Sequence, residues 1–249
     1  MTPIPSLAPS LAGQTVVAIG GSAGIGLATA RLARAEGADV ILTGRNPERL
    51  ERAAAEVGAR TTAAFDATDP AARDRFFGGL AAPVDHVIVT GPGPYYAPLV
   101  ELDRDRAHRD FEDHLWLAVA VAQHAAAGRV RPGGTLVFMG GTGGRRSGRG
   151  LALIGALTAA GPALTKNLAL ELAPVRVNLI AAGFVDTPLS AAILGRDLDA
   201  RREQLRKTLP IGRVVGPEDI AALAIHLMSN TAVTGATFDI DGGQQVVEG

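Results

Sequence analysis

Hydrophobic and polar positions follow a regular alternation along the chain. Short apolar runs rich in β-branched residues, typical of buried strands, are each followed by a longer segment with helical spacing of its apolar residues. The expected strands are residues 15–20, 38–44, 61–65, 85–90, 135–139, 175–180 and 236–240, and the expected helices are residues 25–36, 47–57, 70–80, 104–127, 151–172, 191–209 and 217–228. This order predicts an α/β fold: a Rossmann-like, doubly wound three-layer α/β/α domain with a mostly seven-stranded parallel sheet. At this length, residues 1–249 are expected to form one domain.

Local signals refine this outline. Asn46 followed by Pro47 is typical of a helix start, and Pro132, Gly133 and Gly134 predict a turn before the fifth strand. A glycine-rich loop is expected at 140–150, and residues 191–209 are expected to form a polar, mobile helical insert.

The composition of the chain excludes several classes of partner and several kinds of chemistry. The 24 Lys+Arg and 25 Asp+Glu residues leave a net charge of -1, so a nucleic-acid partner is not expected. The chain has no Cys, which excludes disulfides and thiolate chemistry and favours a cytoplasmic location. Glycines and prolines interrupt the uncharged stretch before Arg31, and the stretch 150–165 is too short for a membrane helix, so no membrane association is expected. No two His residues have metal-ligand spacing, so no metal is predicted.

The first expected strand leads into Gly20-Gly21-Ser22-Ala23-Gly24-Ile25-Gly26 and then a helix. Glycines in this position let the backbone approach a pyrophosphate, and the free N–H groups at the helix start attract its charge. Because the turn lies in the first strand-helix-strand unit, the sequence predicts a dinucleotide site here. Gly20, Ser22, Gly24, Ile25 and Gly26 are its candidate residues.

The end of the second expected strand indicates which dinucleotide is bound. An acidic residue there would accept hydrogen bonds from the ribose 2′-OH of NAD, but this chain has Gly44 followed by Arg45. A small residue next to a guanidinium suits a 2′-phosphate. NADP(H) is therefore predicted in preference to NAD(H).

From residue 16 to residue 243 the sequence resembles the short-chain dehydrogenase/reductase family. The matching segments are the Gly20/Gly24/Gly26 turn, Asp66, Asn167-Leu-Ala-Leu-Glu-Leu-Ala, Arg176-Val177-Asn178, Gly183-Phe184-Val185-Asp186-Thr187 and Asp241-Gly242-Gly243. The resemblance implies that Asp66, with Ala67, lies at the adenine, that Val185 and Thr187 contact the nicotinamide carboxamide, and that Gly91 belongs to the cofactor site. It also implies a homo-oligomer, dimer or tetramer, with the apolar segment 151–172 and the C-terminal segment at its interfaces.

The family's catalytic residues do not match. The family uses a Tyr, a Lys four residues later, a Ser and an Asn, but no Tyr-x-x-x-Lys occurs in this chain. Counting back without gaps from the match at 164–172 places Ile154 and Thr158 at the Tyr and Lys positions. Gly141 takes the Ser position, and a looser alignment places His114 at the Asn position.

Four residues are candidates for a replacement proton donor. His114 carries a side chain suited to acid-base chemistry near neutral pH. Tyr95 and Tyr96 follow an expected strand at the sheet edge where ligands bind, although packing over the pocket mouth is as good an interpretation. Thr142 is a weaker candidate, because one step of register turns a strand side chain to the opposite face.

Arg145, Arg146 and Arg149 lie in the glycine-rich loop, either as a clamp for a substrate anion or as solvated loop charges. The leading functional hypothesis is an NADP(H)-binding oxidoreductase with a non-standard active site, acting on a small carbonyl, alcohol or activated double bond. The alternatives are a catalytically inactive sensor or structural protein that binds the nucleotide, and a non-redox lyase or isomerase that uses His114 or Tyr95.

Overall fold

The computed structural model describes residues 11–247, so the two ends of the predicted domain, including Pro3, Pro5 and Pro9, lie outside the described residues. The described residues contain a seven-stranded sheet in the order β3-β2-β1-β4-β5-β6-β7, and neighbouring strands are parallel. The strands are β1 (Thr15–Ile19), β2 (Asp39–Gly44), β3 (Thr61–Ala64), β4 (Val84–Val89), β5 (Val130–Gly141), β6 (Arg176–Ala182) and β7 (Thr237–Ile240).

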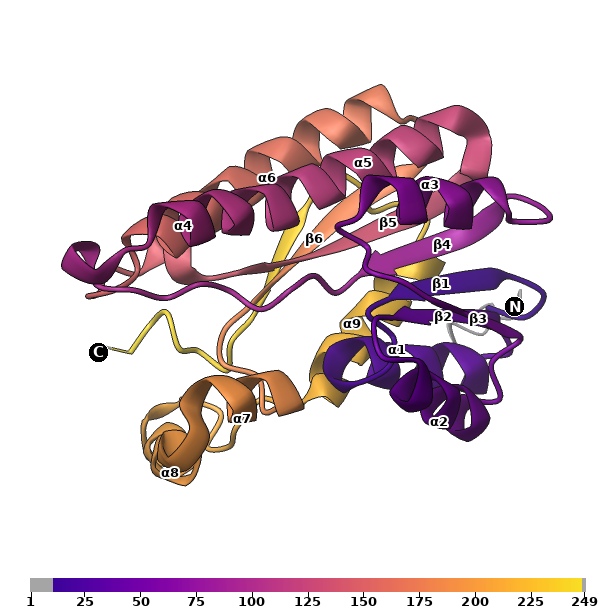
Figure 1. Ribbon diagram of the computed structural model, residues 1–249. Helices are drawn as coiled ribbons and strands as arrows, with labels where there is room; N and C mark the ends of the chain where they lie inside the picture. The colour runs from indigo at the N-terminus through magenta and orange to yellow at the C-terminus, as the bar shows by residue number, and fades with distance from the viewer. Residues whose placement is uncertain (1–10, 248–249) are drawn as a thin grey trace, which may run out of the picture.

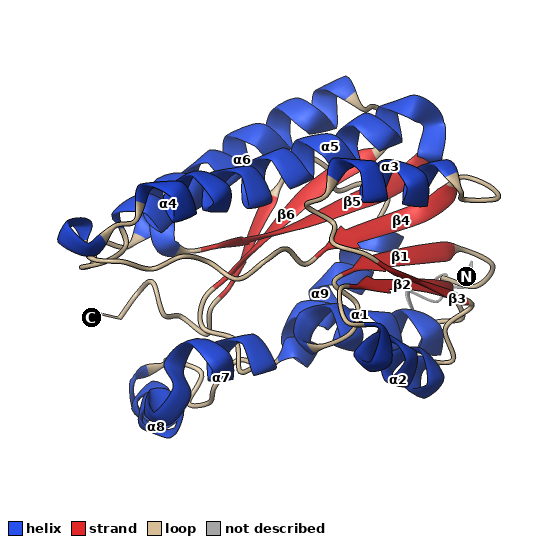
Figure 2. Cartoon of the chain, viewed as in Figure 1, coloured by secondary structure: helices blue, strands red, loops and turns tan. Residues whose placement is uncertain are grey.

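Helices cover both faces of this sheet (Figures 1 and 2). The α-helices are α1 (Gly24–Ala35), α2 (Pro47–Val57), α3 (Pro70–Gly78), α4 (Arg104–Phe111), α5 (Leu117–His124), α6 (Ala152–Glu171), α7 (Pro188–Leu194), α8 (Leu198–Thr208) and α9 (Pro217–Ser229). Helices α3 to α6 form one layer, and α1, α2 and α9 form the other. The predicted doubly wound α/β/α fold is confirmed. None of the helices within residues 11–247 is long and apolar enough to cross a bilayer.

Alternate residues of the central strands enter two separate cores. Val16 and Ala18 of β1 pack with the α1, α2 and α9 layer, whereas Val17 and Ile19 pack with the opposite layer. A strand buried on both faces needs apolar residues at every position. This explains why the strands appear in the sequence as continuous apolar runs.

The chain order changes direction next to β1. After β1, β2 and β3 the chain crosses back, and β4 pairs with the free edge of β1. The loops that leave β1 and β4 diverge at their carboxyl ends, which opens a crevice outside the sheet. Helices α7 and α8 stand at this end of the molecule, away from the sheet (Figure 1).

The predicted helix 104–127 is helical throughout, but it is not α-helical throughout. A π-helical turn at Glu112–Trp116 separates α4 from α5, and a second π-helical segment, Ala125–Arg129, follows α5. A π turn adds one residue to a helical turn, which a count of apolar spacing does not detect. The first of these turns carries His114.

The turn predicted at Pro132, Gly133 and Gly134 lies inside the bounds of β5, which begins at Val130. Gly133 has φ +81°, and the register with β4 shifts between Val84 and His86. A Cβ on Gly134 would lie 2.3 Å from the carbonyl oxygen of Asp85. These glycines therefore form an irregularity inside the strand, where the two backbones approach closely.

The predicted insert 191–209 consists of two helices, and it starts earlier than predicted. Helix α7 begins at Pro188, where the Thr187 side chain accepts a hydrogen bond from the Ser190 N–H and the Ser190 hydroxyl accepts one from the Thr187 N–H. Helix α7 ends before Gly195, whose φ is +52°, and α8 follows after a short 3-10 turn. The reciprocal cap fixes the start of this pair beside Val185.

Arg176 and Asn178 of β6 bind backbone carbonyls. Both terminal nitrogens of buried Arg176 donate to the end of α9, Nη1 to Leu227 O at 2.6 Å and Nη2 to Met228 O at 2.7 Å. Asn178 Nδ2 donates to Val233 O at 3.0 Å. A guanidinium at a helix C-terminus satisfies carbonyls that have no helical partner. The Arg-Val-Asn segment thus stabilises the fold and takes no part in the site.

Candidate cofactor and active site

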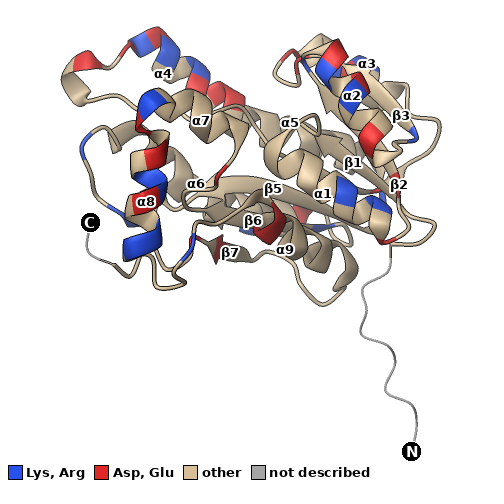
Figure 3. Ribbon diagram, turned by 90° about the horizontal axis from the view of Figure 1, so that it is seen from below, with Lys and Arg blue, Asp and Glu red and all other residues tan. Residues whose placement is uncertain are grey.

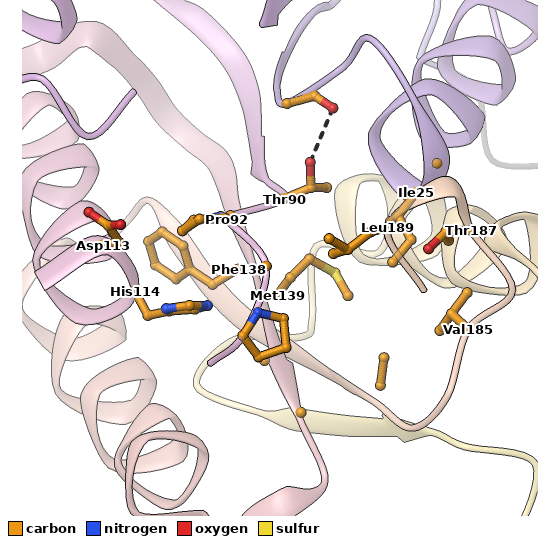
Figure 4. Close-up of a pocket in the computed structure, with 18 of the residues that line it drawn as sticks. Ile25, Thr90, Pro92, Asp113, His114, Phe138, Met139, Val185, Thr187 and Leu189 are labelled. Carbon is orange, nitrogen blue, oxygen red and sulfur yellow. Dashed lines mark hydrogen bonds between the residues drawn. The ribbon is translucent and has the colours of Figure 1, made fainter. Parts of the chain in front are cut away.

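A cavity of about 1050 Å³ lies at the carboxyl ends of the strands. Its walls come from the loops after β1, β2, β4, β5 and β6, together with α6, α7 and the π turn before α5. Figure 4 shows His114 and Asp113 on one side of it and Val185, Thr187 and Leu189 on the other, with Phe138 and Met139 of β5 between them. One continuous space therefore joins the predicted cofactor residues to the predicted catalytic positions.

The glycine turn has the backbone geometry that an anion site needs. Gly20 and Gly24 have φ +83° and +52°, which a side chain would oppose. A Cβ on Gly26 would lie 2.5 Å from the carbonyl oxygen of Gly20, so only glycine lets α1 pack this close to β1. Gly20, Ser22, Gly24 and Ile25 line the cavity, while Gly26 packs behind them. The first N–H groups of α1 face this turn, so the residues fit a pyrophosphate.

Two arginines lie at the β2 end of the cavity. Arg45 lines it, as predicted for a 2′-phosphate site, and so does Arg49 from the first turn of α2. Arg49 Nε donates to Ser22 Oγ at 3.3 Å, which connects this helix to the glycine turn. A Cβ on Gly44 would lie 3.0 Å from Ser22 Oγ, so the small residue keeps this corner open. Sequence reasoning missed Arg49, although its place one turn into the helix after Arg45 was a usable signal.

The remaining predicted cofactor residues also line this cavity: Asp66, Ala67, Gly91, Val185 and Thr187. Asp66 Oδ1 accepts from the backbone N–H and the hydroxyl of Thr68, at 3.0 and 2.9 Å. A Cβ on Gly24 would lie 3.5 Å from Thr187 Cβ, so the loop that carries Thr187 faces the glycine turn.

Thr90, which follows β4, lies at the crevice between the two diverging loops and connects its two sides. Its hydroxyl donates to Ile19 O at 2.9 Å and so links the ends of β4 and β1.

The residues at the family's Ser, Tyr and Lys positions gather at one point on the cavity wall. A Cβ on Gly141 would lie 3.2 Å from Thr158 Cγ2, and the Thr158 hydroxyl donates to Ile154 O at 2.8 Å within α6. Ile154 is buried, and all three residues line the cavity. An alkyl chain, a hydroxyl bonded to its own helix and a glycine offer no proton donor for catalysis near neutral pH.

His114 lies across the cavity from Val185 and Thr187 (Figure 4). Its Nδ1 is 2.8 Å from the carbonyl oxygen of Asp110 and 3.4 Å from Asp110 Oδ1. Burial raises the pKa of the Asp110 carboxyl, and neighbouring His114 opposes that rise. The imidazole is thus held through its Nδ1 by a residue of its own helix, and the ring extends into the cavity.

Tyr95 and Tyr96 have different surroundings. Tyr95 is buried in a small cluster with Ala97 and Ala107, and its hydroxyl accepts from the Asp103 N–H at 3.0 Å. It therefore has a packing role. Tyr96 lines the cavity with about half of its surface exposed, and burial of its hydroxyl, with the nearby Asp110, raises its pKa. Thr142 is buried and also lines the cavity.

The three arginines of the loop after β5 also differ in their surroundings. Arg145 forms an ion pair with Asp239, and Arg149 is exposed. Arg146 lines the cavity, where it is joined by Arg201 of α8, a residue that sequence reasoning did not single out. Within residues 11–247, no three acidic or His side chains gather as a metal-binding group.

Known proteins share both the sequence and the fold. A family model described as "Enoyl-(Acyl carrier protein) reductase" matches residues 20–245. Sorbitol dehydrogenase of Cereibacter sphaeroides is 32% identical over 255 residues, which cover 94% of this chain and 98% of that relative. "Inactive 2-(S)-hydroxypropyl-CoM dehydrogenase 2" of Xanthobacter autotrophicus is 34% identical over 232 residues, covering 88% and 100%. A solved "small-chain dehydrogenase in complex with NADPH" superposes with a TM-score of 0.80 at 28% identity, covering 94% of this chain and 99% of that one.

These matches and the cavity define a nucleotide-binding oxidoreductase fold. The chain belongs to the short-chain dehydrogenase/reductase family. The resemblance inferred from the glycine turn and the later segments is confirmed.

Proposed function

We propose that this chain is a single-domain, cytoplasmic, NADP(H)-dependent oxidoreductase that uses His114 in place of the family's Tyr as its proton donor. Its substrate is a small carbonyl compound, an alcohol or an activated double bond. The observation that carries the proposal is the single cavity that contains both the glycine turn with Arg45 and the ring of His114. An NADPH complex in a structural relative is consistent with this choice of cofactor.

The cofactor supplies the hydride when it is bound. In this proposal the backbone of the glycine turn binds the pyrophosphate, and Arg45 with Arg49 binds the 2′-phosphate. Val185 and Thr187 hold the nicotinamide end. The buried apolar residues of β5 and α6 around the reacting end, Phe138 and Ile154 among them, exclude water from it.

His114 supplies the proton in this scheme. The Asp110 carbonyl accepts the Nδ1–H, which fixes the ring and leaves Nε2 to donate to a substrate oxygen. The Asp110 carboxylate, with Oδ1 at 3.4 Å from Nδ1, stabilises the protonated ring. For an oxidation the same nitrogen accepts the proton.

A second candidate function is nucleotide binding without catalysis. It is favoured by the occupied Thr158 hydroxyl and by Ile154 at the Tyr position, and one relative carries the word "Inactive" in its name. This candidate keeps the cofactor half and assigns His114 a packing role.

An assay of NADPH oxidation over a panel of aldehydes, ketones and activated alkenes separates the two candidates. For His114→Gln we expect the rate to fall by about 10²–10⁴ with unchanged NADPH affinity, because only the positioned acid is lost. His108→Gln, on an exposed position of α4, is the matched control. Turnover that survives in His114→Gln but is lost in Tyr96→Phe would overturn the role of His114, and no turnover by the wild type would favour the second candidate.

We further propose that the chain forms a homo-oligomer through the α4–α6 layer. Trp116 and Leu170, both in this layer, are 65% and 79% exposed. Burial of such side chains against a second copy is favourable. A mass measurement at micromolar concentration is expected to give a dimer or tetramer, and Leu170→Glu is expected to lower that mass.

A further inference from the structure

Two pairs of arginines that are neighbours in the sequence lie near the cavity. In each pair, one arginine forms an ion pair and the other lines the cavity. In the loop after β5, Arg145 pairs with Asp239. On α8, Arg202 forms a bidentate pair with Asp186, with nitrogen–oxygen distances of 2.9 and 2.8 Å. The sequence neighbours of these residues, Arg146 and Arg201, instead line the cavity. Figure 3 shows that basic residues alternate with acidic ones along α8.

Arg146 and Arg201 carry charges that the protein does not neutralise. Both are half-buried, and neither forms an ion pair with an acid of residues 11–247. The hydrogen bond of Arg201 is neutral, from Nη1 to Gln204 Oε1 at 2.9 Å. Burial, followed by the repulsion of Arg146, lowers the pKa of the Arg201 guanidinium. Two like charges that line one partly buried cavity cost free energy unless an anion binds there.

These arginines lie far from the arginines of the cofactor site. Arg45 follows β2 and Arg146 follows β5, and β1 and β4 lie between those strands. Three strand spacings of ~4.8 Å separate the two ends by about 14 Å. An anion bound by Arg146 and Arg201 is therefore a different group from the 2′-phosphate.

The part of the cavity wall that comes from α6 and α7 is largely apolar. It includes Leu151, Ile154, Leu157, Ile193 and Leu194. The acids of the cavity wall, Asp66 and Asp113, come from the β3 loop and the π turn, so they belong to other elements. A molecule that fits this half has a reacting group near His114, an apolar middle and a negative end.

We propose that Arg146 and Arg201 bind an anionic group, a carboxylate, sulfonate or phosphate, at the end of the substrate away from the reacting carbon. This inference rests on the proposed function for the identity of the reacting group, and it adds that the substrate is an anion. Guanidinium groups bind such oxyanions through paired, charge-assisted hydrogen bonds.

The test is a calorimetric titration of the purified protein in the presence and absence of NADP+, the oxidised cofactor, which has no hydride to give a carbonyl and so allows no turnover. The probes are aldehydes and ketones in pairs, each as the free carboxylate and as its methyl ester. The proteins are wild type, Arg146→Gln, Arg201→Gln and the double variant. Arg149→Gln is the control, from an exposed position of the same loop that does not line the cavity. We expect the wild type to bind at least one carboxylate about 10- to 100-fold more tightly than its ester, because each charged hydrogen bond is strong.

The double variant is expected to lose that preference, and Arg149→Gln to retain it. The inference is overturned if no carboxylate of the panel binds the wild type more tightly than its ester, or if the preference survives in the double variant. It is also overturned if the double variant weakens NADP+ as much as Arg45→Gln does, because the pair would then bind the cofactor. Failure of NADP+ to bind the wild type, with the carboxylate preference intact in its absence, would instead reject the proposed function alone.

Discussion

The cofactor half and the catalytic half of the cavity differ in what builds them. The cofactor half is made largely of backbone, and a Cβ on Gly26 or Gly20 would collide with neighbouring chain atoms. The catalytic half depends on side chains, and Ile154 and Thr158 pack in α6 without disturbing it. Residues that the fold requires are retained wherever the fold is retained. Residues that only the reaction requires can be replaced without a change of fold. Membership of the family therefore establishes the scaffold, and the reaction has to be argued from the site.

The largest effect is expected when the family's catalytic side chains are restored. In the His114→Gln background, we expect the triple variant Gly141→Ser, Ile154→Tyr, Thr158→Lys to raise NADPH turnover by about 10²–10⁴, because it supplies the positioned acid that this background lacks to an intact cofactor half. The three positions are adjacent, and a Cβ on Gly141 requires only a small shift of Thr158 Cγ2, at 3.2 Å. The triple variant with Phe in place of Tyr is the control. Equal rates of the two variants would contradict the alignment.

Activity and binding measured at acidic pH also depend on how stable the folded protein is at that pH. Burial lowers the pKa of His86, at the opposite end of β4, to about 4, with Asp85 opposing the shift and Arg176 adding to it. The unfolded chain binds this proton at higher pH than the folded chain. The neutral ring therefore stabilises the fold fully above pH 6.5, and we expect about 3 kcal/mol to be lost between pH 6.5 and about 4.

Urea unfolding across this pH range measures the effect. His86→Gln is expected to flatten the dependence, and His108→Gln, on the surface, to leave it unchanged. A slope in His86→Gln equal to that of wild type would assign the pH dependence to other groups.

The choice of nucleotide sharpens the description of the cofactor half. Arg45→Asp combined with Arg49→Gln is expected to weaken NADPH by about 10- to 100-fold and to leave NADH affinity within a few-fold, since only NADPH carries the 2′-phosphate. Fluorescence titration measures both constants. Arg52→Gln, exposed on α2, is the control. Equal losses for both nucleotides would place these arginines elsewhere on the cofactor.

A smaller effect is expected from the glycine behind the turn. Gly26→Ala places a Cβ 2.5 Å from Gly20 O and is expected to lower the free energy of unfolding by about 1–3 kcal/mol and to weaken NADPH. A Cβ on Gly78, in α3, meets no heavy atom of residues 11–247 within 4 Å, so Gly78→Ala is expected to be neutral or stabilising. Similar unfolding midpoints for the two variants would reject this account of the turn.

The sequence alone predicts the fold because its strands are buried on both faces and its glycines mark the turns. The order of strands and helices, the glycine turn and the segment with Val185 and Thr187 follow from such local patterns. The π turn does not, since one inserted residue leaves the apolar spacing almost unchanged. Residues 132–134 predict a turn, but not that the strand β5 begins before it.

The catalytic half is less predictable because it depends on contacts between distant elements. His114 is identified from the alignment, but its support by Asp110 needs the geometry of the π turn. Tyr95 looks equivalent to Tyr96 in sequence, yet only Tyr96 lines the cavity. Arg201 of α8 lines the same cavity as Arg146, and no local pattern indicates this.

The central claim is that the cofactor half is complete although the family's catalytic residues are replaced. Calorimetric titration of the wild-type protein with NADPH and NADH tests it most directly. The account predicts saturable binding of NADPH, tighter than that of NADH. No binding of either nucleotide would contradict it.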